Sequence, residues 1–101
     1  MNSQPKNPRH TLVIGDVRFT PAHEIDRQAG LLGWISCAID DLQLDGITLR
    51  TTANGRLTLA YPARRDQRGI QHPFMLPITE RARASVEEQI LAALKRQGWC
   101  Q

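Results

Sequence analysis

The chain has 101 residues, 41% of them hydrophobic, and its 13 lysines and arginines exceed its 10 aspartates and glutamates, which gives a formal charge of +3. This length and composition suit a single domain with one modest core, which we expect over residues 11–101. The apolar runs are too short to cross a bilayer and the first residues do not resemble a signal peptide, so we expect a cytoplasmic protein rather than a membrane protein.

The residues before this domain have a different composition. Residues 1–10 contain two prolines and several polar side chains but no apolar run. Ordering them would bury almost nothing to offset the lost chain entropy, so we expect a flexible N-terminal arm. The two cysteines, Cys37 and Cys100, do not form a framework of disulfides and suit a reducing compartment.

The first predicted elements are a strand and a loop. Residues 11–19 are rich in β-branched side chains, which indicates a strand, and Gly15 marks a bulge or bend within it. Residues 20–30 contain Pro21, Gly30 and mixed charges without a steady period. We therefore expect a connecting loop there.

A second strand is predicted over residues 31–40. Ile35 and Cys37 fall on one face of this strand, whereas Leu32 and Trp34 fall on the other. Because both faces carry apolar side chains, the strand is expected to be central in a sheet and covered on both sides.

A turn and a hairpin are expected to follow. Residues 40–46 are rich in aspartate and end in glycine, which is typical of a turn. Residues 47–61 then alternate apolar and polar side chains on either side of Asn54-Gly55, a dipeptide that closes tight hairpins. The second strand of this hairpin must end at Pro62, which has no N–H to donate to a ladder, so the next residues are expected to form a loop.

The end of the chain predicts a helix that packs on the sheet. Five apolar side chains form one stripe at helical spacing: Ala82, Val86, Ile90, Ala93 and Leu94. Two N-termini are compatible with the pattern, Thr79 or a capping box of Ser85 and Glu88, and Pro77 favours the earlier one. Gly98 is suited to the position just after the helix, which we expect over residues 79–97.

The loop after Pro62 carries a local basic patch. Arg64, Arg65 and Arg68 share five positions with a single carboxylate, Asp66. Arginine presents a planar fork that holds a phosphate through two hydrogen bonds, so this loop is a candidate nucleic-acid contact. The alternative interpretation is a solvated turn.

Catalytic and metal sites have little support in the sequence. His72 has no suitably spaced partner, because His10 and His23 are scattered and neither cysteine is near. Asp40 and Asp41 are neighbours on opposite faces of a strand, a poor geometry for a cooperating acid and base. We therefore expect no metal, no cofactor and no catalytic residue.

Several short motifs follow one another in a defined order over residues 13–94: GDVRF, AIDD, ITLR, NG, LTLAYPARR, IQHPF and RASVEEQIL. In this order they resemble the stage V sporulation protein G (SpoVG, septation protein) family. The resemblance implies a small α+β domain with a curved antiparallel β-sheet and a C-terminal α-helix packed on one face. It also implies a homodimer and a nucleic-acid-binding regulator of septation or gene expression, which acts on DNA and, in some members, on RNA.

The resemblance also assigns site residues. The basic pair that follows a strand in the family falls on Arg64 and Arg65, and its helix arginine falls on Arg83. We add Arg81, on the solvent side of the same helix, to these candidate nucleic-acid contacts. The chain departs from the family in a shorter turn before His72 and in an apolar insertion over residues 74–78.

A protein-interaction module is the alternative function. Leu32, Trp34 and Phe74 are apolar groups that one helix on one sheet face cannot all cover. They are candidate interface residues, either for a protein partner at an exposed sheet face or edge or for a second copy of the chain. Trp99 is expected to pack back on the end of the helix or to join that interface.

Overall fold

The computed structural model describes residues 12–99. The N-terminal arm expected over residues 1–10 and the thiol of Cys100 lie outside these residues. The elements are β1 (Ile14–Pro21), α1 (Glu24–Gln28), β2 (Leu31–Ile39), β3 (Leu42–Thr51), β4 (Leu57–Ala60), β5 (Ala63–Arg65), β6 (Gln71–Pro73) and α2 (Glu80–Arg96).

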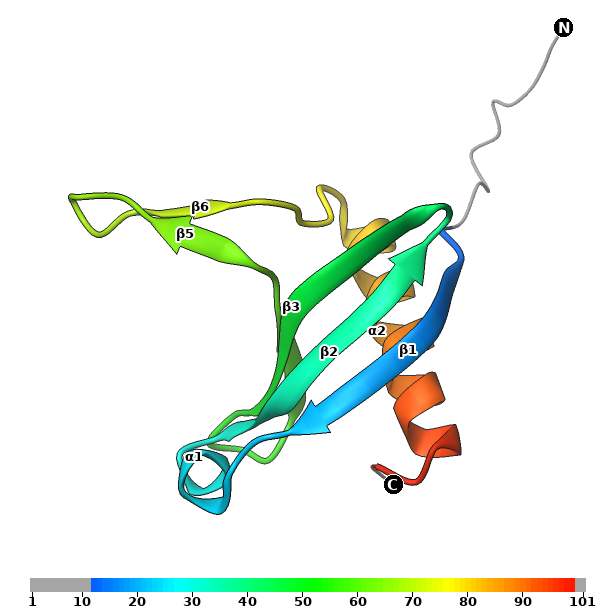
Figure 1. Cartoon of the computed structure of the whole chain (residues 1–101), viewed down its shortest axis with the longest axis horizontal. Helices are drawn as coiled ribbons and strands as arrows, with labels where there is room; N and C mark the ends of the chain where they lie inside the picture. The colour runs from blue at the N-terminus through cyan, green and yellow to red at the C-terminus, as the bar shows by residue number, and fades with distance from the viewer. Residues whose placement is uncertain (1–11, 100–101) are drawn as a thin grey trace, which may run out of the picture.

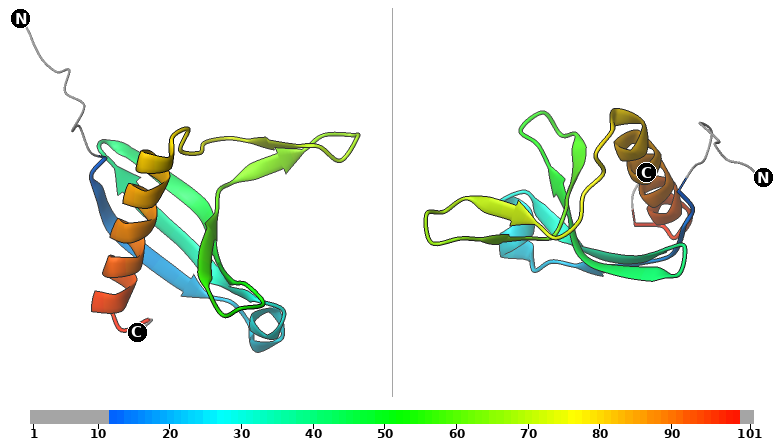
Figure 2. Two further views of the ribbon diagram at one scale, coloured as in Figure 1. Left: turned by 180° about the vertical axis from the view of Figure 1, so that it is seen from behind. Right: turned by 90° about the horizontal axis from the view of Figure 1, so that it is seen from above.

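The main sheet is antiparallel and open, with the strand order β1-β2-β3-β4 (Figure 1). Helix α2 covers one of its faces, whereas β5 and β6 form a separate two-stranded sheet that projects from the body (Figure 2). This arrangement confirms the predicted α+β fold class. Among the residues described, no helix is both long and apolar enough to span a bilayer.

The core lies between α2 and the facing side of the sheet. Ile35 of β2 pairs with Ile47 of β3, and both side chains are fully buried against Ile90 and Leu94 of the helix. Each such side chain stabilises the fold by roughly 1.5–3 kcal/mol relative to an exposed one. The helical stripe and the central position predicted for residues 31–40 are therefore confirmed. The expectation that β2 is covered on both sides is wrong, because α2 covers one face and Trp34 on the other face is 38% exposed.

Helix α2 begins and ends where the sequence predicted. The Thr79 hydroxyl accepts a hydrogen bond from the Ala82 amide at 3.0 Å, so Thr79 and not Ser85 is the N-cap. At the other end Gly98 adopts a φ of 87°, and the Trp99 amide donates to the Leu94 carbonyl at 2.9 Å. This is the Schellman pattern, which requires a residue that tolerates the left-handed region.

The expectation of a loop over residues 20–30 is wrong in part. Thr20 and Pro21 extend β1, and the next residues form the single-turn helix α1. A helix of one turn is too short to show a 3.6-residue period, so the sequence pattern could not reveal it. The bulge expected near Gly15 is present: the pairing of β1 with β2 shifts there, and Asp16 takes the left-handed φ of 51°.

The turn expected over residues 40–46 is shorter than predicted. Only Asp40 and Asp41 form it, and Leu42 already begins β3. The pairing of β2 with β3 shifts between Ile35 and Cys37, and on the β3 side Gly46 has a φ of 90°. A bulge thus replaces most of the expected turn.

Leu32 does not lie on the same face as Trp34. The pairing of β2 with β3 shifts between Leu31 and Gly33, which adds a residue to β2. Leu32 packs against the core cluster and lines a small cavity with Leu49 and Trp99, on the α2 side of the sheet. Trp34 remains on the opposite face, with 38% of its surface exposed.

Gly33 leaves no room for a side chain beside β1. A Cβ added there would collide with the Thr20 carbonyl oxygen and lie 2.6 Å from Cζ of Phe19. We predict that Gly33→Ala lowers the free energy of unfolding by roughly 1–3 kcal/mol, because the strands must separate to make room. Urea denaturation measures this change.

Gly15→Ala is the matched control, because a Cβ at Gly15 has no heavy atom within 4 Å. It should change the free energy of unfolding by less than about 1 kcal/mol. Equal destabilisation by the two variants would contradict the close contact at Gly33.

Candidate nucleic-acid interface

The predicted basic loop is a β-hairpin. Residues 63–73, called here the basic hairpin, pair in the register Ala63↔Pro73, Arg64↔His72 and Arg65↔Gln71. Arg64 and Arg65 therefore lie in a strand, and only Arg68 lies in the turn, which corrects the expected loop. Pro62 lies just before β5 and Pro73 is the last residue of β6, and at such positions a missing N–H costs little.

Asp66 organises the turn of the basic hairpin. Its Oδ1 accepts hydrogen bonds from the backbone amides of Arg68 at 2.8 Å and Ile70 at 3.0 Å. His72 Nε2 donates to its Oδ2 at 2.8 Å, since a carboxylate can only accept. One side chain therefore ties the turn to the returning strand.

Two further features hold the same turn. Gly69 has a φ of 84°, a conformation that glycine adopts without strain. The Arg65 guanidinium donates to the Gly69 carbonyl at 3.3 Å through Nη1. The turn is thus held by local hydrogen bonds, although it is exposed to solvent.

The hydrogen bond from His72, with those from the two backbone amides, holds the pKa of Asp66 below its usual value of 3.8. Asp66 is therefore ionised at neutral pH and acts as an acceptor within the turn. Its ion pair with Arg68 spans 3.7 Å at an exposed position, and such pairs contribute little. Three exposed arginines, Arg64, Arg65 and Arg68, thus face solvent from one hairpin with a single carboxylate among them.

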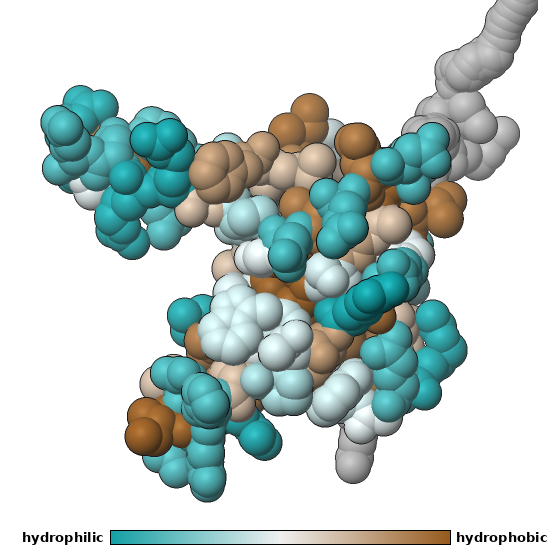
Figure 3. Space-filling model, in the orientation of Figure 1, coloured by the Kyte–Doolittle hydropathy of each residue, from teal (hydrophilic) through white to brown (hydrophobic). Residues whose placement is uncertain are grey.

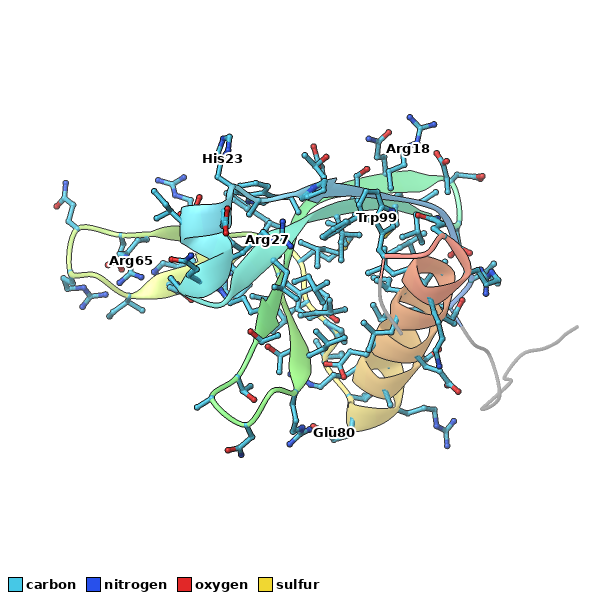
Figure 4. The ribbon with its side chains drawn as sticks, turned by 90° about the horizontal axis from the view of Figure 1, so that it is seen from below. Arg18, His23, Arg27, Arg65, Glu80 and Trp99 are labelled. Atoms are coloured by element: carbon cyan, nitrogen blue, oxygen red, sulfur yellow. The ribbon has the colours of Figure 1, made fainter. Side chains whose placement is uncertain are left out.

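The two helix arginines lie apart from this hairpin. Arg81 and Arg83 belong to the first turns of α2, and Arg83 Nε lies 3.7 Å from Glu80 Oε2. Figure 4 shows Glu80, at the start of α2, well separated from Arg65 in the hairpin. The predicted site residues therefore form two groups. The hairpin carries Arg64, Arg65 and Arg68, and α2 carries the other two.

Apolar side chains gather where the hairpin returns to the body. Phe74 is 68% exposed and Ile78 is 90% exposed, and Met75 and Leu76 between them are also exposed. Met75 and Leu76 line an apolar cavity of about 300 Å³, together with Leu12, Ile39, Asp40, Leu42, Leu44, Tyr61, Pro77 and Val86. Of the three predicted interface residues, Trp34 and Phe74 are exposed and Leu32 is packed inside.

Tyr61 is a member of this cavity that sequence reasoning missed. Its hydroxyl is buried and has no hydrogen-bond partner within residues 12–99. Burial raises the pKa of Tyr61, nearby Glu87 raises it further, and Arg83 opposes the shift. The sequence pattern placed Tyr61 only at the end of the alternating residues 47–61, because the cavity depends on how residues 74–78 return to the body.

The candidate considered for metal binding, His72, lies in the basic hairpin. No three metal-binding side chains cluster among residues 12–99. His72 is engaged by Asp66 instead, a contact that the predicted loop could not show. The sequence does contain a signal for the turn itself, because an aspartate followed by a glycine three residues later, as in Asp66 and Gly69, is typical of a tight turn.

We predict that Asp66→Ala loosens the basic hairpin and leaves the body unchanged, because its hydrogen bonds are local to the turn. Backbone amide exchange at Arg68 and Ile70, followed by NMR, should become faster, while the melting temperature stays the same. Asp66→Asn is the control, since its Oδ1 still accepts from both amides. Unchanged exchange in Asp66→Ala would contradict the assigned role.

The same turn should respond to acid. The folded-state pKa of Asp66 is depressed, so its stabilising contribution is fully present at neutral pH. This contribution is lost as the pH falls below about 4, through the depressed pKa. The Arg68 and Ile70 amide resonances of the wild type should shift over that range, whereas those of Asp66→Asn should not follow the same transition.

Comparison of the sequence with protein-family models and with curated proteins finds no match.

Proposed function

We propose that this chain is a homodimeric, non-enzymatic nucleic-acid-binding regulator of the SpoVG type, which acts in the cytoplasm on septation or gene expression. Its phosphate contacts are Arg64, Arg65 and Arg68 of the basic hairpin. The observation that carries the proposal is the excess of exposed arginines on a hairpin that projects from the body (Figure 2).

The shape of the basic hairpin supports this function. The major groove of B-DNA admits a two-stranded β-ribbon, and the hairpin is such a ribbon. Adjacent residues of a strand point to opposite faces, so Arg64 and Arg65 present guanidinium groups on both sides of it. A ribbon lying in a groove would thereby reach phosphates on both strands of a duplex.

A dimer supports the function further. Two-fold symmetry presents the basic hairpin twice, so that binding of one copy raises the effective concentration of the second at the same nucleic acid. The exposed apolar residues over 74–78, next to the hairpin, are candidates for the dimer contact, because exposed apolar groups gathered together commonly mark an interface.

We predict that Arg64→Ala/Arg65→Ala/Arg68→Ala weakens binding to labelled duplex DNA in fluorescence anisotropy. Each lost phosphate contact should also reduce the slope of log affinity against log salt by roughly 0.9. Arg27→Ala/Arg56→Ala/Arg96→Ala is the charge-matched control, with its changes in α1, in the turn before β4 and at the end of α2. Equal losses in both variants would show that net charge matters and the hairpin does not.

The protein-interaction module is the second candidate, and the exposed Phe74 and Ile78 favour it. We predict that Phe74→Ser/Ile78→Ser converts the dimer into a monomer in sedimentation velocity, because both side chains are exposed in the single chain. Arg64→Ala/Arg65→Ala/Arg68→Ala should remain dimeric. A wild type that stays monomeric at all concentrations would contradict the dimer. Duplex binding that survives in the serine variant would show that the apolar contact and the nucleic-acid contact are made by different residues.

A further inference from the structure

The sheet face opposite α2 carries the aromatic side chain of Trp34 among small and polar side chains. Trp34 lies on this face, called here the outer face, in a row with Thr20 of β1, Thr48 of β3 and Ala60 of β4. Ser36 and Thr58 flank the row. Figure 3 looks onto this face and shows pale and teal side chains over much of it, with brown areas between them.

Two arginines bracket Trp34 on the outer face. Arg18 lies two residues before Thr20, and Arg50 lies two residues after Thr48, so each is a diagonal neighbour of the indole on an adjacent strand. Diagonal neighbours have Cα atoms about 7–8 Å apart, within reach of a long side chain. Both arginines are exposed, and Figure 4 shows Arg18 pointing away from α2.

The ion pair between Arg18 and Asp16 on this face is weak. Arg18 Nε donates to Asp16 Oδ1 at 3.2 Å, but both side chains are mostly exposed, and exposed ion pairs contribute little. Nε is one of five donors on the guanidinium, so the outer edge of the fork still points to solvent. Arg18 and Arg50 therefore both present positive charge to solvent beside Trp34.

The outer face is continuous with the basic hairpin. A shallow hollow of about 400 Å³ is lined by Thr48, Arg50 and Ala60 of the sheet and by Ala63 and Gln71 of the hairpin. In Figure 3 this hollow opens below the projecting hairpin. A chain lying along it would pass from the hairpin arginines to Arg50 and then to Trp34.

We propose that the outer face is a stacking platform for single-stranded nucleic acid, on which Trp34 stacks a base while Arg18 and Arg50 contact the flanking phosphates. The inference rests on the proposed function and deepens it by naming unpaired strands as a ligand. Sites for single strands combine an aromatic side chain with cations that follow the backbone, and this face has both. A protein-binding core would instead be depleted of charge.

The platform predicts a distinction between ligands. A base is free to stack on a side chain only when it is unpaired. The phosphates, by contrast, are as accessible to the basic hairpin in a duplex as in a single strand. Trp34 should therefore matter for single strands and not for duplex DNA. The hairpin arginines should matter for both.

The test uses labelled oligothymidylate, oligouridylate and a DNA duplex with the full chain. Trp34→Thr places a β-branched residue that suits a strand and should weaken single-strand binding by roughly 5- to 150-fold while duplex affinity is unchanged. Trp34→Phe should retain most of the affinity. Leu42→Thr, which removes another exposed apolar side chain from the sheet, is the matched control and should bind like the wild type.

A fluorescence arm reports stacking directly. The chain has two tryptophans, so Trp99→Phe leaves Trp34 as the only tryptophan. With excitation selective for tryptophan, which avoids Tyr61, addition of oligothymidylate should quench the Trp34 emission along the same binding curve as anisotropy. Oligothymidylate and oligouridylate then show whether the platform prefers DNA or RNA.

Each failure has a distinct meaning. Single-strand binding that is equal in Trp34→Thr and the wild type overturns the platform, while duplex binding that depends on the hairpin arginines preserves the proposed function. A dimer that becomes a monomer in Trp34→Thr makes the outer face a contact between copies, which also overturns the platform. Absence of binding to every nucleic acid overturns both proposals.

Discussion

The burial of α2 against one side of the sheet is the constraint on which the rest of the molecule depends. Ile35 and Ile47 meet Ile90 and Leu94 without solvent exposure, and this contact decides which side of each strand is the inner one. Because side chains alternate along a strand, the same contact places Trp34 on the outer face with its neighbouring arginines. The surface available for binding is thus set by the packing of the core.

A second level of order is local to the basic hairpin. Its residues contribute nothing to the buried core, so its shape rests on cross-strand pairing and on the hydrogen bonds of Asp66. A carboxylate placed among three arginines would ordinarily weaken an anion site. Here it is engaged by backbone amides and by His72, so that it fixes the turn while the arginines remain exposed. Asp66 and His72 thus hold the turn, while the arginines supply the positive charge, so a small hairpin is both ordered and basic.

Much of the fold follows from sequence patterns, because local chemistry carries the information. Thr79 starts α2 through the hydrogen bond of its side chain, and Gly98 ends it through its left-handed backbone conformation. The alternation around Ile35 identifies the inner face of β2. What could not be predicted depends on partners distant in the sequence. The bulge that turns Leu32 inward arises from its pairing with β3. The spacing of the arginines predicts a basic patch, but the strand that holds Arg64 forms only because His72 pairs with it from the returning strand.

NMR titration of the labelled chain with a short single strand, and then with a duplex, tests the central claim most directly, since it maps contacts residue by residue. Amide resonances over residues 64–68 should shift with both ligands, and the indole N–H of Trp34 should shift with the single strand, whereas the end of α2 should be unaffected. Shifts confined to α2, or no shifts at low salt, would contradict the claim.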